Sequence, residues 1–102
     1  MKGEIDMQTA LKKRIEIRES TMIDVAEILI SALHLKFEPG DLDPDTPLFG
    51  SGLGLDSVDA VVIIVELESR FNISISEEEG KNALRTINTL IDLIIRKKYG
   101  NA

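Results

Sequence analysis

Cysteine is missing from the sequence altogether. Its absence excludes disulfides, thiolate metal sites and cysteine nucleophiles, and it fits a reducing compartment. No segment approaches the ~20 consecutive apolar residues of a membrane span, and the first residues lack the apolar core of a signal peptide. We therefore expect a cytoplasmic protein without a membrane span, and we expect it to be a monomer.

Lysine and arginine are missing from residues 38–69, although the formal net charge of the whole chain is only -6. The acidic side chains of this stretch are Glu38, Asp41, Asp43, Asp45, Asp56, Asp59, Glu66 and Glu68. Such a surface repels phosphate backbones and attracts basic patches on proteins, so we expect protein partners and no nucleic acid. The alternative is that these acids only keep the protein in solution.

Proline is scarce, and all three prolines lie in residues 36–56. A connection of this length without secondary structure points either to a function or to an unrecognised element. The 102 residues suffice for one domain, and 43% hydrophobic with 29% charged residues is typical of a globular protein.

Apolar side chains three and four residues apart predict helices on both sides of this connection. We expect helices over residues 21–34, 57–70, 77–84 and 87–98, which makes the fold a small all-α bundle of three to four helices. The expected N-caps are Ser20 or Thr21, Asp56, Ser76 and Thr86. The expected domain division is a charged, partly helical or disordered extension over 1–20, a main domain over 21–98 and a tail over 99–102.

The helix over 57–70 carries apolar side chains on two sides. One stripe consists of Val61, Ile64, Leu67 and Phe71, widened by Ala60 and Ile63, and the other consists of Val58, Val62 and Val65. A helix of a small bundle cannot bury both sides, so the second stripe is a candidate contact surface for a partner. The alternative is that the long connection covers it.

Ser57 stands between a glycine-rich loop and this helix. Gly50, Gly52 and Gly54 alternate ahead of it, which permits backbone angles closed to other residues and the close approach of another molecule. With Asp56 as the N-cap, Ser57 presents a hydroxyl on the first helical turn, surrounded by acids. We expect the rest of the chain to hold this hydroxyl in an accessible position.

Other kinds of site fail because a required residue is missing. A serine hydrolase needs a base, and the only histidine, His34, is expected as an exposed residue at the end of the first helix. The glycine loop lacks the lysine of a phosphate-binding loop and a preceding strand. Residues 41–45 alternate aspartates like a calcium loop but lack its glycine and glutamate. What remains is a serine that another protein must activate, so we expect no enzyme activity.

The segments around Ser57 and in the last helix resemble the acyl carrier proteins. That family reads approximately D-L-G-x-D-S-L-D before its second helix and T-V-x-D-A-I-D-Y-I in its last. This chain has G-L-G-L-D-S-V-D at 52–59 and T-I-N-T-L-I-D-L-I at 86–94. The likeness covers about residues 21–98.

The resemblance implies that Ser57 carries 4′-phosphopantetheine, transferred from coenzyme A by a separate phosphopantetheinyl transferase that uses Mg²⁺. The thiol of this arm would hold acyl groups as thioesters for fatty-acid, polyketide-like or specialised lipid synthesis. Asp56 would help the transferase to recognise the site. Acyl chains would lie along Ala60, Val61 and Ile64. Acyl-loading and acyl-processing enzymes with basic patches would contact Val58, Asp59, Val62, Val65, Glu66 and Glu68.

The chain also departs from the family. Val58, Val62 and Val65 stand where the family usually has leucine, glutamate and methionine, so this helix face is more apolar and less acidic than usual. The difference points to partners other than those of housekeeping fatty-acid synthesis. The residues before Thr21 also exceed the usual length of the first helix. Two alternatives stay open: a peptidyl or aminoacyl-type carrier, and an unmodified helical interaction module.

Overall fold

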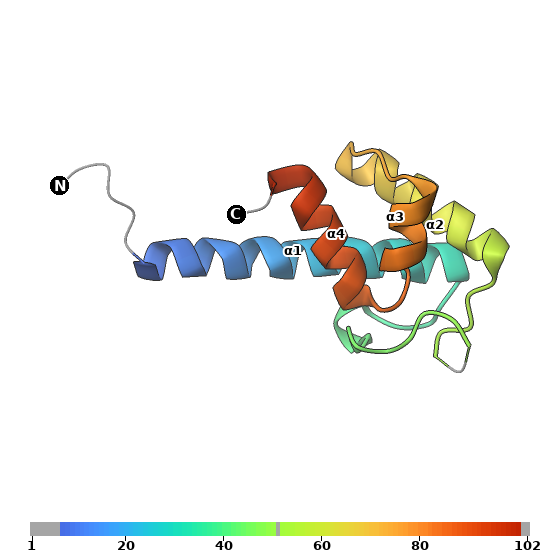
Figure 1. The fold of residues 1–102 in the computed structure, drawn as a ribbon. Helices are drawn as coiled ribbons and strands as arrows, with labels where there is room; N and C mark the ends of the chain where they lie inside the picture. Colours follow the sequence, from blue (N-terminus) through green and yellow to red (C-terminus); the bar gives the residue numbers. More distant parts are fainter. Residues whose placement is uncertain (1–6, 51, 101–102) are drawn as a thin grey trace.

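The first helix, α1, is the longest element of the protein. The computed structural model describes residues 7–50 and 52–100, and α1 spans Met7–Leu33. Strong helix formers such as Leu11, Lys12 and Lys13 dominate its first half. At 1.5 Å per residue the helix is about 40 Å long. Its first half projects beyond the other helices, which gather around the second half (Figure 1).

The helix start that the sequence predicts at Ser20 or Thr21 is wrong. Both residues lie inside α1, and Thr21 Oγ1 donates a hydrogen bond to the Ile17 carbonyl oxygen at 2.7 Å. A hydroxyl bonded to the carbonyl four residues back is a feature of a helix interior, not of an N-cap. The division into an extension over 1–20 and a domain over 21–98 stays a prediction. Residues 1–6 and 101–102 lie outside the described residues.

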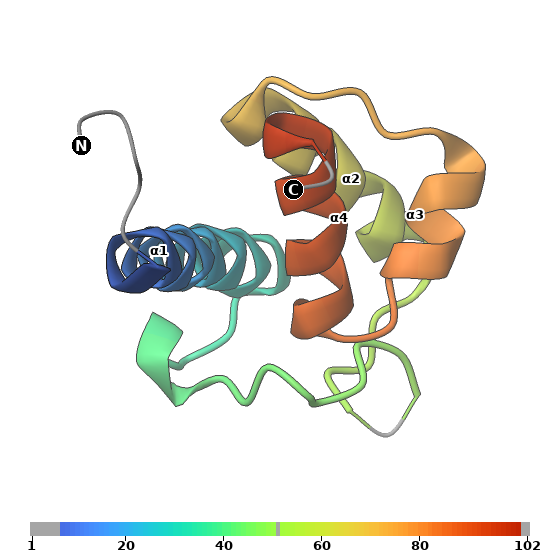
Figure 2. The ribbon, with the colours of Figure 1, turned by 60° about the vertical axis from the view of Figure 1, so that its left-hand side comes forward.

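Three shorter helices complete the bundle: α2 (Ser57–Phe71), α3 (Glu77–Ala83) and α4 (Ile87–Tyr99). α2 and α4 pack against α1, and α3 packs against α4 (Figure 2). Asp56, Ser76 and Thr86 act as their N-caps, each accepting a hydrogen bond from the backbone N–H three residues ahead. The described ranges contain no strand, so the predicted all-α bundle is confirmed.

The core lies where α1, α2 and α4 meet. Its fully buried side chains include Val25, Leu29, Ile63, Leu67, Leu90 and Ile94. Full burial of one such side chain contributes about 1.5–3 kcal/mol, so this set is a main favourable contribution to folding. None of the helices within the described ranges combines the length and apolar character that crossing a bilayer requires.

The buried face of α2 differs from the predicted one. Ile63, Leu67 and Phe71 are buried, whereas Val61 is 63% exposed. Almost every position between Val58 and Leu67 is apolar, so the spacing alone did not show which side of the helix faces the core.

The long connection between α1 and α2 is attached to the bundle at several points. It contains one element that the sequence did not reveal, a 3-10 turn, η1 (Pro39–Asp41). Leu42, Leu48 and Leu55 bury their side chains in the core. Figure 2 shows the connection crossing beneath the start of α4 on its way to α2.

Candidate functional site

Ser57 is the first residue of α2, and its side chain is exposed. Asp56 precedes it with an extended backbone (φ -111°, ψ -177°), and Asp56 Oδ1 accepts the Asp59 N–H at 2.8 Å. Asp59 Oδ2 accepts the Asp56 N–H in return at 3.1 Å. This reciprocal capping box satisfies two N–H groups and fixes where the helix begins. The hydroxyl of Ser57 is therefore held at a defined place on the surface.

The loop ahead of Ser57 is held by backbone hydrogen bonds. The Leu48 N–H donates to the Arg85 carbonyl and the Leu55 N–H donates to the Leu48 carbonyl, both at 2.9 Å. Gly50 and Gly54 take positive φ values of 69° and 73°, which favour glycine, so two of the three predicted loop glycines meet a backbone need. The segment just before α4 thus supports the loop, and the loop supports the start of α2.

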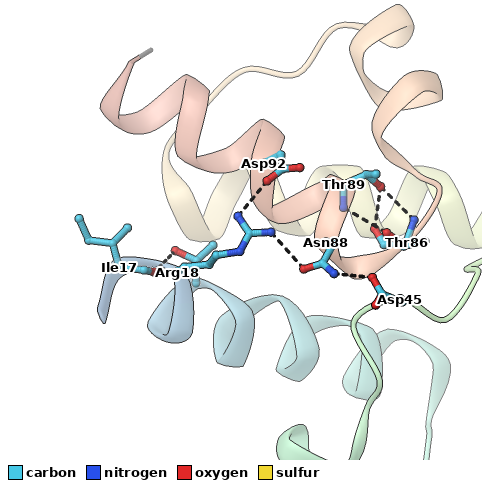
Figure 3. Close-up of polar contacts among 8 residues, drawn as sticks. Ile17, Arg18, Asp45, Thr86, Asn88, Thr89 and Asp92 are labelled. Carbon is cyan, nitrogen blue, oxygen red and sulfur yellow. Dashed lines mark hydrogen bonds and ion pairs between the residues drawn. The ribbon is translucent and has the colours of Figure 1, made fainter. Parts of the chain in front are cut away.

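A polar chain ties the same connection to α1 (Figure 3). Arg18 donates to Asp92 Oδ1 at 2.8 Å and to Asn88 Oδ1 at 3.0 Å. Asn88 Nδ2 donates to Asp45 Oδ1 at 2.6 Å, and the Asn88 N–H donates to the Pro44 carbonyl at 3.0 Å. A continuous chain of hydrogen bonds therefore runs from Arg18 on α1 through Asn88 on α4 to Asp45 on the connection. These residues were not predicted as functional, because their contacts join segments far apart in the chain.

An open groove of about 540 Å³ runs between α2 and α3. Its lining residues are Phe49, Ser57, Ala60, Val61, Ile64, Val65, Ile75, Ser76, Glu77, Gly80, Lys81 and Leu84. Ser57 lies on its wall together with Ala60, Val61 and Ile64, the three residues expected to line an acyl chain. The groove is within the size range of small-molecule sites and is mainly apolar, as an acyl chain or a pantetheine arm requires.

Sequence reasoning missed the wall of the groove that α3 provides. The feature of the sequence that could have indicated this wall is Gly80, a glycine inside a short helix rich in acidic residues. A Cβ atom at Gly80 would lie 3.3 Å from Ile64 Cδ1, so the missing side chain lets α3 approach α2. Lys81 adds a positive charge to this wall.

The outer face of α2 is exposed along three of its valines. The exposed fractions of Val58, Val62 and Val65 are 69%, 43% and 55%. The alternative that the long connection covers this stripe is therefore wrong. Glu66 is exposed beside it, whereas Glu68 is half-buried and its Oε2 accepts the Ile75 N–H at 2.8 Å.

Ion pairs hold the helices around the groove. Arg70 of α2 donates to Asp24 and Glu27 of α1, both at 2.7 Å, and the hydrogen bond to Glu27 is the main cause that raises the pKa of Arg70. Glu79 of α3 accepts the Ser76 N–H and pairs with Lys97 of α4 at 2.9 Å. The Ser76 N–H, with Lys97 second, lowers the pKa of Glu79 from 4.5 to about 2. Both groups are charged near neutral pH.

The aspartates of the connection and His34, which the sequence analysis considered for other kinds of site, have structural positions of their own. Residues 41–45 use their carboxylates for turns, since Asp41 Oδ2 accepts the Glu38 N–H and Asp43 Oδ1 accepts the Asp45 N–H. Across the part of the chain that the structure describes, no group of three or more His, Cys, Asp or Glu side chains could hold a metal ion. His34 directly follows α1, exposed and with a left-handed backbone (φ 55°).

A four-helix bundle that presents one serine at the start of a capped helix, beside an apolar groove, has the architecture of a small carrier domain. Comparison with protein families supports this class: the family described as "Phosphopantetheine attachment site" matches residues 24–94, a range that includes Ser57. The chain belongs to this family. The cofactor that goes with it is covalently bound 4′-phosphopantetheine, as the resemblance to the acyl carrier proteins implied.

Curated relatives agree with the family assignment. The chain is 36% identical over 86 residues to acyl carrier protein 3, chloroplastic, of Cuphea lanceolata, covering 84% of this chain and 57% of the relative. It is 32% identical over 82 residues to the acyl carrier protein of Chlorobium luteolum, and the match covers 80% of this chain and 95% of the relative. The acyl carrier protein of Chlorobium phaeobacteroides is also 32% identical, over 73 residues, and the match covers 72% of this chain and 88% of the relative. The chain thus spans little more than half of the plant protein but most of each bacterial one.

Proposed function

We propose that this protein carries acyl groups on a 4′-phosphopantetheine arm attached to the Ser57 hydroxyl. The observation that carries the proposal is the exposed hydroxyl on the first residue of a capped helix, on the wall of an apolar groove. The attached group supplies a thiol that holds the acyl cargo as a thioester. The polypeptide itself supplies the anchor and the groove.

Asp56, the residue before Ser57, has two roles in this proposal. Asp56 holds the helix start through its bond from Asp59, and its exposed carboxylate offers the transferase a fixed point of recognition. Loss of such an N-cap costs about 1 kcal/mol of helix stability. Among the described residues the Ser57 hydroxyl donates no hydrogen bond to a base, and the Asp56 and Asp59 carboxylates accept backbone N–H groups, so in this proposal the transferase removes the hydroxyl proton.

The groove between α2 and α3 favours an apolar cargo. Ala60, Val61 and Ile64 form its α2 wall, and burying an acyl chain there removes apolar surface from water at roughly 25 cal/mol per Å². We therefore propose acyl chains of fatty-acid, polyketide-like or specialised lipid synthesis as cargo. An aminoacyl cargo gains less from this lining.

The exposed face of α2 is the proposed docking surface for acyl-loading and acyl-processing enzymes. Val58, Val62 and Val65 would make apolar contacts, while Asp59 and Glu66 would steer basic patches toward it. Glu68 contributes less, because one of its oxygens already serves the Ile75 N–H. The cytoplasmic location expected from the sequence stays a prediction.

The test is the intact mass of the protein after coexpression with a broad-specificity phosphopantetheinyl transferase. We expect the wild type to gain one phosphopantetheinyl group and Ser57→Ala to gain none. Ser69→Ala is the matched control, an exposed serine near the other end of α2, and it should gain the group as the wild type does. A wild type without added mass, or a Ser57→Ala variant that still gains it, would rule the proposal out.

A further inference from the structure

The connection between α1 and α2 rests on the beginning of α4, where residues 44–48 lie beside residues 85–88. Four contacts join the two segments: hydrogen bonds from the Asn88 N–H to the Pro44 carbonyl at 3.0 Å, from Asn88 Nδ2 to Asp45 Oδ1 at 2.6 Å and from the Leu48 N–H to the Arg85 carbonyl at 2.9 Å, and an antiparallel bridge between Pro47 and Thr86. Two of the four contacts belong to Asn88, which therefore holds one end of this junction.

The same stretch of the connection determines where Ser57 lies. The Leu55 N–H donates to the Leu48 carbonyl at 2.9 Å, and Phe49 forms a bridge with Leu55. Leu48 and Leu55 are both buried, and Leu55 stands two residues before Ser57. A shift of residues 44–48 is therefore passed to Leu55 and from there to the start of α2.

Asn88 is held from both sides by partners that fix its orientation (Figure 3). Its Oδ1 accepts a hydrogen bond from Arg18 at 3.0 Å, and its Nδ2 donates to Asp45 at 2.6 Å. A guanidinium only donates and an ionised carboxylate only accepts, so turning the amide over would lose both bonds. Arg18 is itself fixed by Asp92 at 2.8 Å. The amide of Asn88 therefore has one orientation, in which it holds Asp45 against α4.

The hydrogen bond between Asn88 and Asp45 affects local order more than the stability of the whole fold. The bond is exposed, and the net contribution of such a bond to the free energy of unfolding is small. Leu42, Leu48 and Leu55 bury their side chains and keep the connection attached when this bond is absent. A surface segment can lose order locally while the rest of the protein stays folded.

We propose that Asn88 is a positioning residue for the modification of Ser57. Its amide holds residues 44–48, and through Leu48 and Leu55 it keeps the Ser57 hydroxyl in the arrangement that a transferase binds. Asn88 is not among the residues that line the groove beside Ser57, so its effect passes through the connection. A transferase that binds a loosened connection must order it first, and this cost lowers its affinity for the carrier. The inference rests on the proposed carrier function.

The substitution Asn88→Asp removes the contact with Asp45 and leaves the contact with Arg18. The new carboxylate still accepts from Arg18, but it has no N–H for Asp45 and repels it. A negative charge at the second residue of α4 also favours the positive end of the helix, so slower modification would not come from a weaker α4. The double variant, Asn88→Asp with Asp45→Asn, moves the amide to the connection and restores a pair of donor and acceptor.

The test is the steady-state kinetics of a broad-specificity phosphopantetheinyl transferase, with the unmodified full chain as the varied substrate and coenzyme A in excess. We expect Asn88→Asp to raise the KM for the carrier about fivefold, the effect of one hydrogen bond of ordinary strength, with kcat unchanged. The double variant should return toward the KM of the wild type, by more than Asp45→Asn changes the KM on its own.

Asn82→Asp is the matched control. It makes the same charge change on an exposed residue of α3 that does not line the groove beside Ser57 and, within the described residues, is not bonded to the connection. It should leave the KM as it is in the wild type. Melting curves followed by circular dichroism should show every variant folded at the assay temperature.

Four outcomes would overturn the role given to Asn88. They are an equal KM for the wild type and Asn88→Asp, a rise of the same size in Asn82→Asp, a double variant with a KM as high as that of Asn88→Asp, and a KM that follows the melting temperature across the variants instead of the contact between Asn88 and Asp45. A wild type that gains no mass at all is a separate result, because it overturns the carrier function itself and with it this inference.

Discussion

Single side chains in this protein join elements that are distant in the sequence. Glu79 is an example, because its carboxylate accepts the N–H of Ser76, the N-cap of α3, and two hydrogen bonds from Lys97 Nζ of α4. Asn88 is another, since it contacts both Arg18 and Asp45. Each of these residues acts as a junction, so a change at one position affects two contacts at once.

Glu79 should make the stability depend on pH in the acid range. Its pKa is lowered from 4.5 to about 2, so the unfolded chain takes up a proton before the folded chain does. The contribution of this carboxylate is complete above pH 4.5 and is lost as the pH falls toward about 2. We expect the melting temperature of Glu79→Gln to change less over this window than that of the wild type, measured by circular dichroism.

Glu78→Gln is the control for this measurement, because the Glu78 carboxylate makes no hydrogen bond within the described residues. Its melting temperature should follow that of the wild type through the acid range. Parallel curves for Glu79→Gln and the wild type would contradict the role given to Glu79.

Gly52 should not tolerate a side chain. A Cβ atom at this position would overlap the carbonyl oxygen of Pro47, which also accepts the Leu53 N–H at 3.0 Å. Backbone cannot move aside as a flexible side chain does, so we expect Gly52→Ala to lower the free energy of unfolding by about 1–3 kcal/mol. Urea denaturation measures the loss.

Gly40→Ala is the matched control, since a Cβ there meets nothing within 4 Å and its φ is not positive. Alanine at such a position stabilises a protein by about 0.4–1 kcal/mol through the unfolded state. Two variants with the same sign of effect would count against the close packing of the loop ahead of Ser57.

At the scale of elements, the sequence predicted what local chemistry determines. The starts of α2, α3 and α4 follow from Asp56, Ser76 and Thr86, because an N-cap and its partner lie within four residues. The start of α1 was missed, because contacts between Arg18 and α4 anchor the helix across Thr21. Local signals cannot reveal a stabilising contact seventy residues away.

The groove was predictable in part for the same reason. Ala60, Val61 and Ile64 follow Ser57 on one helix, so spacing and the family resemblance placed them together. The opposite wall depends on how α3 packs, and Gly80 gives only an indirect sign of it. The exposure of Val61 also required the structure, since a helix this rich in apolar residues has no clear polar side.

At the scale of the whole molecule, one stretch of the chain carries acidic side chains alone. Residues 38–69 hold no lysine or arginine, whereas α1 holds charges of both signs and the end of α4 is basic. The ion pairs among the described residues are mostly exposed, and such pairs contribute about 0–1 kcal/mol each. Within residues 38–69 no basic side chain offsets the repulsion among the acids.

Added salt should raise the melting temperature of this protein. Ions screen the repulsion between exposed acids such as Glu38, Asp41 and Glu66, and the Debye length falls to about 3 Å at 1 M salt. We expect a rise of a few degrees between about 0.02 M and about 0.5 M NaCl, and a further rise with divalent cations. Glu66→Gln should reduce the response, while a melting temperature insensitive to both salts would contradict the prediction.

The polar chain through Asn88 has a consequence for anyone who shortens this protein. A version trimmed to begin at residue 21, to imitate the usual length of its relatives, would lose Arg18 and with it the side-chain brace between α1 and the two segments that Asn88 joins. The loss of Arg18 would then weaken the support of the connection that leads to Ser57, through Asn88 and Asp45. Safe trimming has to stop on the N-terminal side of Arg18.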